Sequence, residues 1–362
     1  MPPHSSGSVD FNLPPFAGAP EARFAPAPLT GVLPEEFYVT SNLPTWVFRN
    51  RRWEMPVRPR MDGAIVIRKG HLEVVEPRLV AAGELVLLGS REDGFEGIVT
   101  IATGFLGTES GAAEFRFMST AVSRERPVNY QVLAQLLEAE RQRGGFLIWV
   151  VGPALVHSRA RQDFEWFIRE GYVQAVLAGN AVAVHDIEAA LFGTTLGMSD
   201  TGSPAPQGHS LHVRAINRIR QAGSIEAAVA QGIVKSGIMH TLVTTGTPYL
   251  LAGSIRDDGP LPGVITDAVL AQDAMREYCV QATGAVLLAT ALHAIAVGNL
   301  LPAFHTHRGV PEPMLTICVD QTEFVVNKLR DRGTHQAHGV VTNAQDFMHV
   351  LRSHTEKCRS QS

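Results

Sequence analysis

The sequence predicts an α/β protein in which a small β-rich domain precedes a domain built on a parallel sheet. Short runs of β-branched and aromatic residues, separated by turn residues, fill the stretch from Glu35 to about Glu125. From Asn129 onwards, continuous apolar runs alternate with helical patterns. Strands that are apolar on both faces and separated by helices are typical of a parallel sheet covered on both sides.

The bulk composition limits the classes of function that the protein can serve. The chain has 362 residues, 45% of them hydrophobic and 18% charged, which allows a sizeable core and roughly two domains. Its net charge is −4, its pI is near 6.4, and it has no long basic block, so we expect no nucleic-acid partner. The cysteines Cys279, Cys318 and Cys358 are odd in number and widely spaced. This favours a reducing compartment, the cytoplasm, over a disulfide framework.

Neither export nor membrane insertion is indicated. The N-terminus lacks a positively charged start followed by an apolar run, so no signal peptide is expected. The apolar segment 285–304 is as long as a membrane span but contains His293, Gly298, Asn299 and Pro302. These interruptions favour a buried strand, a turn and a helix, so we expect no membrane contact.

Composition divides the chain into four parts. Residues 1–33 are rich in Pro, Gly and Ala and predict a flexible or extended arm. Residues 34–125 form the β-rich domain, residues 126–352 form the parallel-sheet domain, and residues 353–362 form a tail. The strands of the β-rich domain are expected at 36–41, 45–50, 51–57, 63–70, 71–77, 84–90, 97–103 and 113–119.

The parallel-sheet domain alternates strands and helices along its whole length. The strands are expected at 146–152, 173–179, 248–254, 285–290, 314–320 and 339–343. The helices are expected at 130–144, 161–171, 209–223, 224–234, 266–282, 291–301, 323–333 and from about residue 343 onwards. In sheets of this kind, ligands bind at the carboxyl ends of the strands.

The expected strand ends carry small and polar residues. Small residues let a ligand approach the backbone, and polar residues can hold it. The residues at these ends are Gly152, Pro153, Gly179, Asn180, Gly253, Ser254, Arg256, Asp257, Asp258, Thr290, His293, Asp320, Thr342 and Asn343. The pattern predicts a ligand crevice along one edge of the sheet.

Two strand ends suggest how a nucleotide could be held. Gly179 and Asn180 fit either a pyrophosphate at a helix N-terminus or an ordinary turn. Asp320 ends an apolar strand, a position where ribose hydroxyls are often held, but no Gly-x-Gly-x-x-Gly follows any expected strand. Any dinucleotide site must therefore be built differently. Cys318 faces the same side of its strand as Asp320 and is expected to be buried and structural rather than catalytic.

Two groups of side chains have metal-binding residue types. His185, Asp186 and Glu188 do not all share one helical face, so capping or solvation of a helix is favoured over a metal. His209 and His212 lie three apart and could form a zinc pair, but helix capping, or one buried and one exposed imidazole, is commoner. We expect no metal.

A series of sequence motifs runs in order from roughly residue 35 to residue 350. They are EEFYVTSNLPTWVFRNRRWE, PRMDGAIVI, GPALVHS, LAGNAVAVHDIEAALFGTTLG, GHSLHVRAINRIRQAGSIEAAV, GIMHTLV, LAGSIRDDGPLPGVITDAVLAQDAMR, LHAIAVGNLLP, TICVDQ and KLRDRGTHQAHGVVTN. On these motifs the chain resembles the family that shares the conserved region of the bifunctional lysine-ketoglutarate reductase/saccharopine dehydrogenase (LOR/SDH) enzymes. That family includes archaeal-type ornithine cyclodeaminases and the C-terminal domain of arginine dihydrolase/ornithine cyclodeaminase proteins.

The resemblance implies a fold, a cofactor and a reaction. The fold is a modified Rossmann domain, similar to the nucleotide-binding fold of deoxyhypusine synthase, preceded by a small β-rich domain. The cofactor is NAD, the partner is a small amino acid or amine, and a homo-oligomer is expected. Family enzymes convert ornithine to proline and ammonia. Hydride leaves the α-carbon, the δ-amine attacks the resulting imine, ammonia leaves and the hydride returns, so the cycle is redox-neutral.

The resemblance also implies roles for particular residues. Those expected to surround NAD are Gly179, Asn180, Gly253, Ser254, Gly298, Asn299 and Asp320. Arg256 would pair with the substrate carboxylate through two hydrogen bonds, and Asn343 would also contact the substrate. Asp257, Asp258 and His293 would hold the substrate ammonium or move its proton. The alternative for Arg256 and Asp257 is a structural ion pair that shapes the loop.

The chain departs from the family pattern at several positions. Residues 320–323 read Asp-Gln-Thr-Glu instead of Asp-Ile-Asn/Asp-Pro, and residues 326–329 read Val-Asn-Lys-Leu instead of Val-Thr-Lys-Leu. Residues 341–343 end in Asn instead of Asp, and no cysteine precedes Cys279 to match the catalytic cysteine of the cyclodeaminases. A divergent NAD-dependent oxidoreductase or aminoalkyl transferase acting on another amine is one alternative, and a non-catalytic NAD-binding subunit is another.

Overall fold

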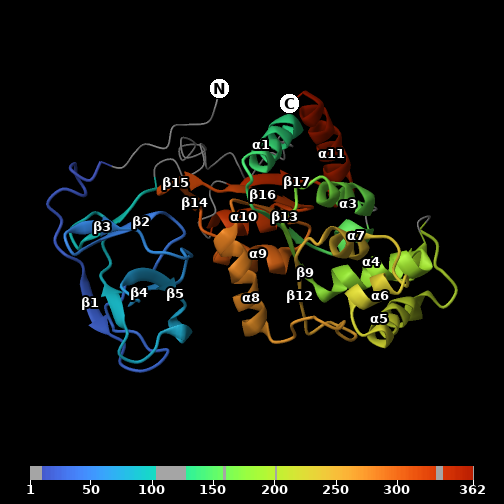
Figure 1. Cartoon of the computed structure of the whole chain (residues 1–362), viewed down its shortest axis with the longest axis horizontal. Coiled ribbons are helices and arrows are strands. Elements are labelled where there is room, and N and C mark those ends of the chain that lie inside the picture. Colours follow the sequence, from blue (N-terminus) through green and yellow to red (C-terminus); the bar gives the residue numbers. More distant parts are fainter. Residues whose placement is uncertain (1–9, 103–127, 158–159, 200–201, 332–336, 362) are drawn as a thin grey trace. The chain divides into compact units, whose positions relative to one another are not determined.

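The computed structural model of the protein divides into two compact units (Figure 1). The described residues are 10–102, 128–157, 160–199, 202–331 and 337–361. The first unit takes in residues 1–123, 298–314 and 329–336. The second unit takes in residues 124–297, 315–328 and 337–362. No helix among the described residues is long and apolar enough to cross a membrane.

The first unit is built from short antiparallel strands. They are β1 Arg23–Pro26, β2 Thr45–Arg49, β3 Arg52–Glu54, β4 Ala64–Arg68, β5 His71–Val75, β6 Leu85–Leu88, β7 Ile98–Thr100, β14 Phe304–His307 and β15 Val310–Pro313. One sheet has the order β1-β6-β4-β5, another has the order β3-β2-β7, and β14 pairs with β15. Ile65, Leu72 and Leu87 lie in an apolar cluster between these strands.

The β-rich character expected of this region is confirmed, with differences of detail. β1 comes from the segment expected to be an extended arm and pairs with β6. The segment 36–41 forms isolated bridges rather than a strand, from Phe37 to Leu88 of β6 and from Val39 to Ala64 of β4. Because the segment bridges first to one strand and then to another, it does not pair with either over enough residues to form a strand. The strand expected at 113–119 lies outside the described residues.

The second unit contains a six-stranded sheet in which every neighbouring pair of strands is parallel. Its strands are β8 Leu147–Val151, β9 Ala175–Gly179, β12 Tyr249–Ala252, β13 Gly284–Leu288, β16 Leu315–Asp320 and β17 His338–Val341. The helices that alternate with them are α1 Tyr130–Gln142, α2 Ala154–His157, α3 Arg161–Arg169, α4 Asn180–Phe192, α5 Leu211–Ala222, α6 Ile225–Ala230, α7 Ile238–Thr245, α8 Ala268–Gln281, α9 Ala291–Leu300, α10 Glu323–Asp331 and α11 Ala344–Gln361. A small hairpin, β10 Thr194–Thr195 and β11 Met198–Ser199, follows α4. The expected parallel sheet is confirmed strand by strand.

The strand order indicates where a sheet of this kind binds a ligand. The order is β12-β9-β8-β13-β16-β17, so the strands, numbered along the chain, read 3-2-1-4-5-6. This is the order of dinucleotide-binding Rossmann folds. Successive strands β9 and β12 are added on one side of β8, and β13, β16 and β17 are then added on its other side, so the direction of strand addition reverses between β8 and β13. Such sheets bind ligands at this reversal point, beyond the carboxyl ends of the two central strands.

Apolar side chains cover both faces of this sheet. All five residues of β8, of β9 and of β13 are buried. Trp149 of β8 packs against Phe164 and Phe167 of α3, and its indole N–H donates to the Tyr172 carbonyl at 2.9 Å. Burial on both faces explains why these strands read as continuous apolar runs.

The C-terminal helix α11 is longer than expected from the sequence. It continues through residues 353–361, which composition assigned to a tail. Its buried residues Phe347, Leu351 and Thr355 recur every four positions, so the helix keeps one covered face well past residue 353. The Thr355 hydroxyl donates to the Leu351 carbonyl at 2.8 Å. The helix also packs against α1.

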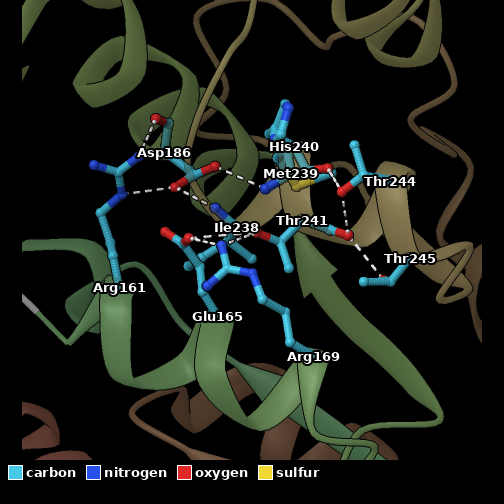
Figure 2. Close-up of polar contacts among 10 residues, drawn as sticks. All are labelled: Arg161, Glu165, Arg169, Asp186, Ile238, Met239, His240, Thr241, Thr244 and Thr245. Atoms are coloured by element: carbon cyan, nitrogen blue, oxygen red, sulfur yellow. Dashed lines mark hydrogen bonds and ion pairs between the residues drawn. The ribbon is translucent and has the colours of Figure 1, made fainter.

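A buried carboxylate joins three helices of the second unit (Figure 2). Asp186 of α4 is 0% exposed and accepts hydrogen bonds from the backbone amides of Ile238 (3.0 Å) and Met239 (2.8 Å), at the start of α7. Its Oδ1 also accepts from Nε of Arg161 in α3, at 2.7 Å. A helix N-terminus stabilises an anion because its first amides have no partner within the helix. A Cβ on Gly237, which precedes α7 with φ +104°, would lie within 2.8 Å of both carboxylate oxygens.

The expectation that Asp186 and Glu188 cap or solvate a helix is confirmed for Asp186 as a cap and is wrong for solvation. Both side chains are 0% exposed. Asp186 caps α7 rather than its own helix. Glu188 accepts hydrogen bonds from the amides of Leu196 (3.0 Å) and Gly197 (2.8 Å) and so holds the β10–β11 hairpin. Partners from other elements compensate for the burial of both charges.

Replacing Asp186 should destabilise the second unit strongly. Asp186→Ala leaves Nε of Arg161 and two buried amides without their acceptor, so we expect the free energy of unfolding to fall by about 3–5 kcal/mol. Urea denaturation measures this. Glu356→Ala, which removes an exposed partner of Arg352 on α11, is the control and should change the value by less than about 1 kcal/mol. An Asp186→Ala effect as small as that of the control would contradict this account of α4.

Candidate functional site

The carboxyl ends of the six parallel strands lie along one edge of the sheet. The expected site residues found at these ends are Gly152, Pro153, Gly179, Gly253, Ser254, Thr290, Asp320, Thr342 and Asn343. Asn180 begins α4, and His293 lies in the first turn of α9. Gly298 and Asn299 lie near the other end of α9 and are described with the first unit. The second unit therefore brings together the expected site residues except these two.

Backbone rather than side chains forms the reversal point between β8 and β13. The Gly152 N–H donates to the Leu288 carbonyl and the Ala289 N–H donates to the Val319 carbonyl, both at 2.9 Å. A Cβ on Gly152 would overlap the Ala289 carbonyl oxygen, so only glycine fits there. Ala289 has φ +53°, a left-handed conformation that costs about 1–2 kcal/mol for an L-residue. Strain of this kind is concentrated at binding sites and active sites.

The His293 imidazole lies directly over Gly179. A Cβ on Gly179 would come within 2.9 Å of the His293 Cε1 atom, so the ring occupies the space that the missing side chain leaves. His293 Nδ1 lies 3.3 Å from the Thr290 hydroxyl. Burial lowers the pKa of His293, and the nearby carboxylate of Asp257 only partly opposes this shift. The imidazole is therefore neutral near pH 7 and can accept a proton.

The stretch from Ser254 to Asp257 is a tight turn after β12. The Ser254 N–H donates to Oδ2 of Asp257 at 2.8 Å, and the Asp257 N–H donates to the Ser254 carbonyl at 3.1 Å. Among the described residues, the Arg256 guanidinium has no ion pair or hydrogen bond, and its side chain is exposed. The structural ion pair between Arg256 and Asp257 is thus not formed. Asp257 shapes the turn through the backbone and leaves Arg256 free to bind an anion.

The neighbouring carboxylate, Asp258, contacts a histidine from another element. Its Oδ2 lies 3.1 Å from Nε2 of His212 in α5. The Asp258 side chain is 66% exposed and that of His212 is 19% exposed. The sequence suggested helix capping, a buried and an exposed imidazole, or a zinc pair with His209 for His212, but not this contact. No group of three or more metal-ligating side chains occurs among the described residues. The contact joins positions 46 residues apart, so no local pattern could reveal it.

The loop Gly253–Ile265, which carries this turn, is fastened to the sheet. The Gly253 N–H donates to the Ile265 carbonyl at 2.8 Å, and the Ile265 N–H donates to the Leu251 carbonyl at 2.9 Å. These bonds extend β12 by a parallel bridge between Ala252 and Ile265. The loop therefore leaves and rejoins the sheet at the same strand end.

The side chains of Asp320 and Asn343 differ in how many of their polar atoms form hydrogen bonds within the protein. Oδ1 of Asp320 accepts from the Thr322 N–H at 3.2 Å, and among the described residues Oδ2 accepts no hydrogen bond. Asn343 caps α11: its Oδ1 accepts from the Asp346 N–H at 2.8 Å, and its Nδ2 donates to the Asp346 carboxylate at 2.6 Å. The Asn-x-x-Asp spacing before an apolar helix was a local signal for this cap. A substrate contact by Asn343 stays a prediction.

Gly298 is needed for close packing within the first unit. A Cβ on Gly298 would overlap Cδ2 of Leu329, so glycine lets α9 approach that side chain closely. Oδ1 of Asn299 is buried and accepts no hydrogen bond from the described residues. A buried amide oxygen without a donor is costly unless a ligand or water supplies one.

Comparison with known proteins places this architecture in a family. Residues 131–351 match the family model for the C-terminal Rossmann fold of arginine dihydrolase ArgZ-like proteins. The chain belongs to that family. It is 44% identical, over 94% of its own length and 79% of the relative's, to an ornithine cyclodeaminase of Methanopyrus kandleri.

Two solved structures show that the similarity covers nearly the whole chain and includes its fold. A putative LOR/SDH protein of Methanococcus maripaludis aligns with a TM-score of 0.84 and 39% identity, covering 94% of this chain and 99% of that one. The ternary complex of AgrE with ornithine and NAD+ aligns with a TM-score of 0.58 and 35% identity, covering 95% of this chain and 47% of that one. The expected family resemblance is confirmed.

The lowered pKa of His293 predicts a pH dependence of stability. An imidazole whose folded pKa lies below its usual 6.5 stabilises the fold relative to His293→Gln above pH 6.5, and this contribution is lost as pH falls towards the folded value. The difference in free energy of unfolding between wild type and His293→Gln should therefore shrink between about pH 7.5 and about pH 5. Urea titrations at both pH values measure it, and a constant difference would contradict the buried environment described for the ring.

Proposed function

We propose that this protein is an NAD-dependent ornithine cyclodeaminase that converts ornithine to proline and ammonia without net oxidation. One observation carries the proposal. AgrE, a relative 35% identical over 95% of this chain, binds ornithine and NAD+ together in its ternary complex. The strand-end edge of the second unit carries groups suited to both ligands.

The residues at this edge fit a dinucleotide. The 3-2-1-4-5-6 strand order places the reversal point at this edge, and the free backbone amides at the N-terminus of α4 suit a pyrophosphate. We assign NAD contacts to Gly179, Gly253 and Ser254, and a ribose contact to the free oxygen of Asp320. NAD, when bound, supplies reversible hydride acceptance.

The side chains around the loop suit a diamino acid. The free guanidinium of Arg256 can hold the α-carboxylate through two parallel hydrogen bonds. The carboxylates of Asp257 and Asp258 attract the substrate ammonium groups, and Asp258 also contacts His212. His293, as a neutral base, can take the proton that an ammonium must lose before its nitrogen acts as a nucleophile.

We also propose that the protein is cytoplasmic. Its three cysteines form no disulfide, which fits a reducing compartment.

We further propose that the protein is a homo-oligomer. Exposed apolar side chains occur at the end of α4 and in the β10–β11 hairpin, where Phe192, Leu196 and Met198 are each at least 38% exposed. Exposed apolar groups that lie together are typical of interfaces. Sedimentation equilibrium tests the proposal, and a monomer at micromolar concentration would refute it.

Purified protein with NAD should convert L-ornithine to proline and ammonia in equal amounts. Because the reaction is redox-neutral, absorbance at 340 nm should not rise as product accumulates. Amino-acid analysis and an ammonia assay measure the two products. Net formation of NADH would instead indicate an oxidoreductase, and a product containing a second amine would indicate an aminoalkyl transferase.

Two single substitutions should separate substrate binding from cofactor binding. Arg256→Ala should raise KM for ornithine by about tenfold or more, because a charge-assisted pair is lost, with Kd for NAD within about twofold of wild type. Asp320→Ala should do the reverse, raising Kd for NAD by about tenfold. Steady-state kinetics and fluorescence titration measure both constants. If each variant changes both constants equally, the separate roles of the two residues are wrong.

A further inference from the structure

Asn180, the first residue of α4, holds the loop that carries Arg256, Asp257 and Asp258. We propose that Asn180 is a positioning residue, whose side chain fixes the loop Gly253–Ile265 for substrate binding without contacting the cofactor. The inference rests on the proposed function, since it assigns this loop to the substrate. It replaces the expectation that the Asn180 side chain surrounds NAD.

The amide of Asn180 is committed to the loop backbone at both ends. The residue is only 3% exposed. Its Oδ1 accepts from the Leu261 N–H at 3.0 Å in a fully buried hydrogen bond, and its Nδ2 lies 3.5 Å from the Gly259 carbonyl oxygen. The two contacts span 81 and 79 residues of sequence and bind opposite sides of the Pro260 bend. A side chain engaged in this way acts on the loop and not on a ligand beside it.

Asn180 is the buried member of a larger set of loop contacts. Nη2 of Arg220 donates to the Pro260 carbonyl at 3.0 Å, and His212 contacts Asp258 at 3.1 Å. Both of these contacts involve exposed groups, whose interactions are screened by water and contribute little. A buried hydrogen bond to an amide that would otherwise be unsatisfied contributes more. Asn180 should therefore dominate the position of the loop.

The position of Asn180 next to Gly179 connects the loop to the candidate base. Gly179 provides the space in which the His293 ring lies, and the next residue anchors the loop that bears Asp257. Two adjacent residues thus set the separation between His293 and Asp257. A displacement of about 1 Å between reacting groups can cost a factor of about 100 in rate. A pyrophosphate at this helix would use backbone amides, which a side-chain substitution leaves in place.

The test separates the two roles in the full-length protein. Asn180→Ala should lower kcat/KM for ornithine by at least about tenfold, because the loop loses its buried anchor. Kd for NAD, titrated without ornithine, should stay within about twofold of the wild-type value. Asn180→Asp keeps an acceptor for the Leu261 N–H and a charge suited to a helix N-terminus but loses the donor to the Gly259 carbonyl, so it should recover part of the lost kcat/KM. A change in overall stability alone would not produce this recovery.

Hydrogen–deuterium exchange gives a readout that does not depend on turnover. Asn180→Ala should speed exchange within Gly253–Ile265, Leu261 included, and leave β8 and β13 protected. Asn180→Ser replaces it if the alanine variant does not fold. Unchanged exchange in the loop, or weaker NAD binding with an unchanged KM for ornithine, would overturn the proposal. If wild type does not cyclise ornithine, the proposed function fails, and the exchange result still decides whether Asn180 anchors the loop.

Discussion

The buried carboxylate of Asp186 is the interaction on which the candidate site depends. It joins α4 to Arg161 of α3 and to the first amides of α7, in a region where an uncompensated charge would cost several kcal/mol. These contacts hold α4 against both neighbouring helices. The first residues of α4 follow β9 directly, at the edge where the strands end. The 253–265 loop contacts Asn180, the first residue of α4, and the His293 ring lies over Gly179 just before it, so the start of α4 sets their geometry.

The second unit builds a nucleotide-binding edge without a glycine-rich fingerprint. In its place, one glycine, Gly152, lets two strand ends meet, and Ala289 adopts a left-handed conformation beside it. The strand order supplies the reversal point, and the charged groups lie on a loop at one side of it. This arrangement separates the backbone-lined part, suited to a cofactor, from Arg256 and the carboxylates, which suit an amino acid. The cyclodeaminase reaction needs both within reach of one substrate carbon.

Local patterns predicted the fold well and the site only in part. Continuous apolar runs identified the strands of the parallel sheet, and most clearly β8, β9 and β13, because burial on both faces is visible in each of these segments by itself. The burial of Asp186 and the loop contact of Asn180 were not predicted, because their partners lie 52 and 81 residues away and charge or polarity alone suggests exposure. Asn343 is a different case, since its cap was readable from Asp346 three residues later. Long-range hydrogen bonds therefore set the limit of the sequence analysis.

The central claim is that the residues at this edge of the sheet catalyse a redox-neutral cyclisation of ornithine. Turnover of L-ornithine labelled with deuterium at the α-carbon, analysed by mass spectrometry of the proline formed, tests it most directly. The account predicts proline that keeps its α-deuterium, because the hydrogen that leaves this carbon returns to it within the same turnover. Proline that has lost the label to water, or the absence of proline with NAD present, would contradict the account.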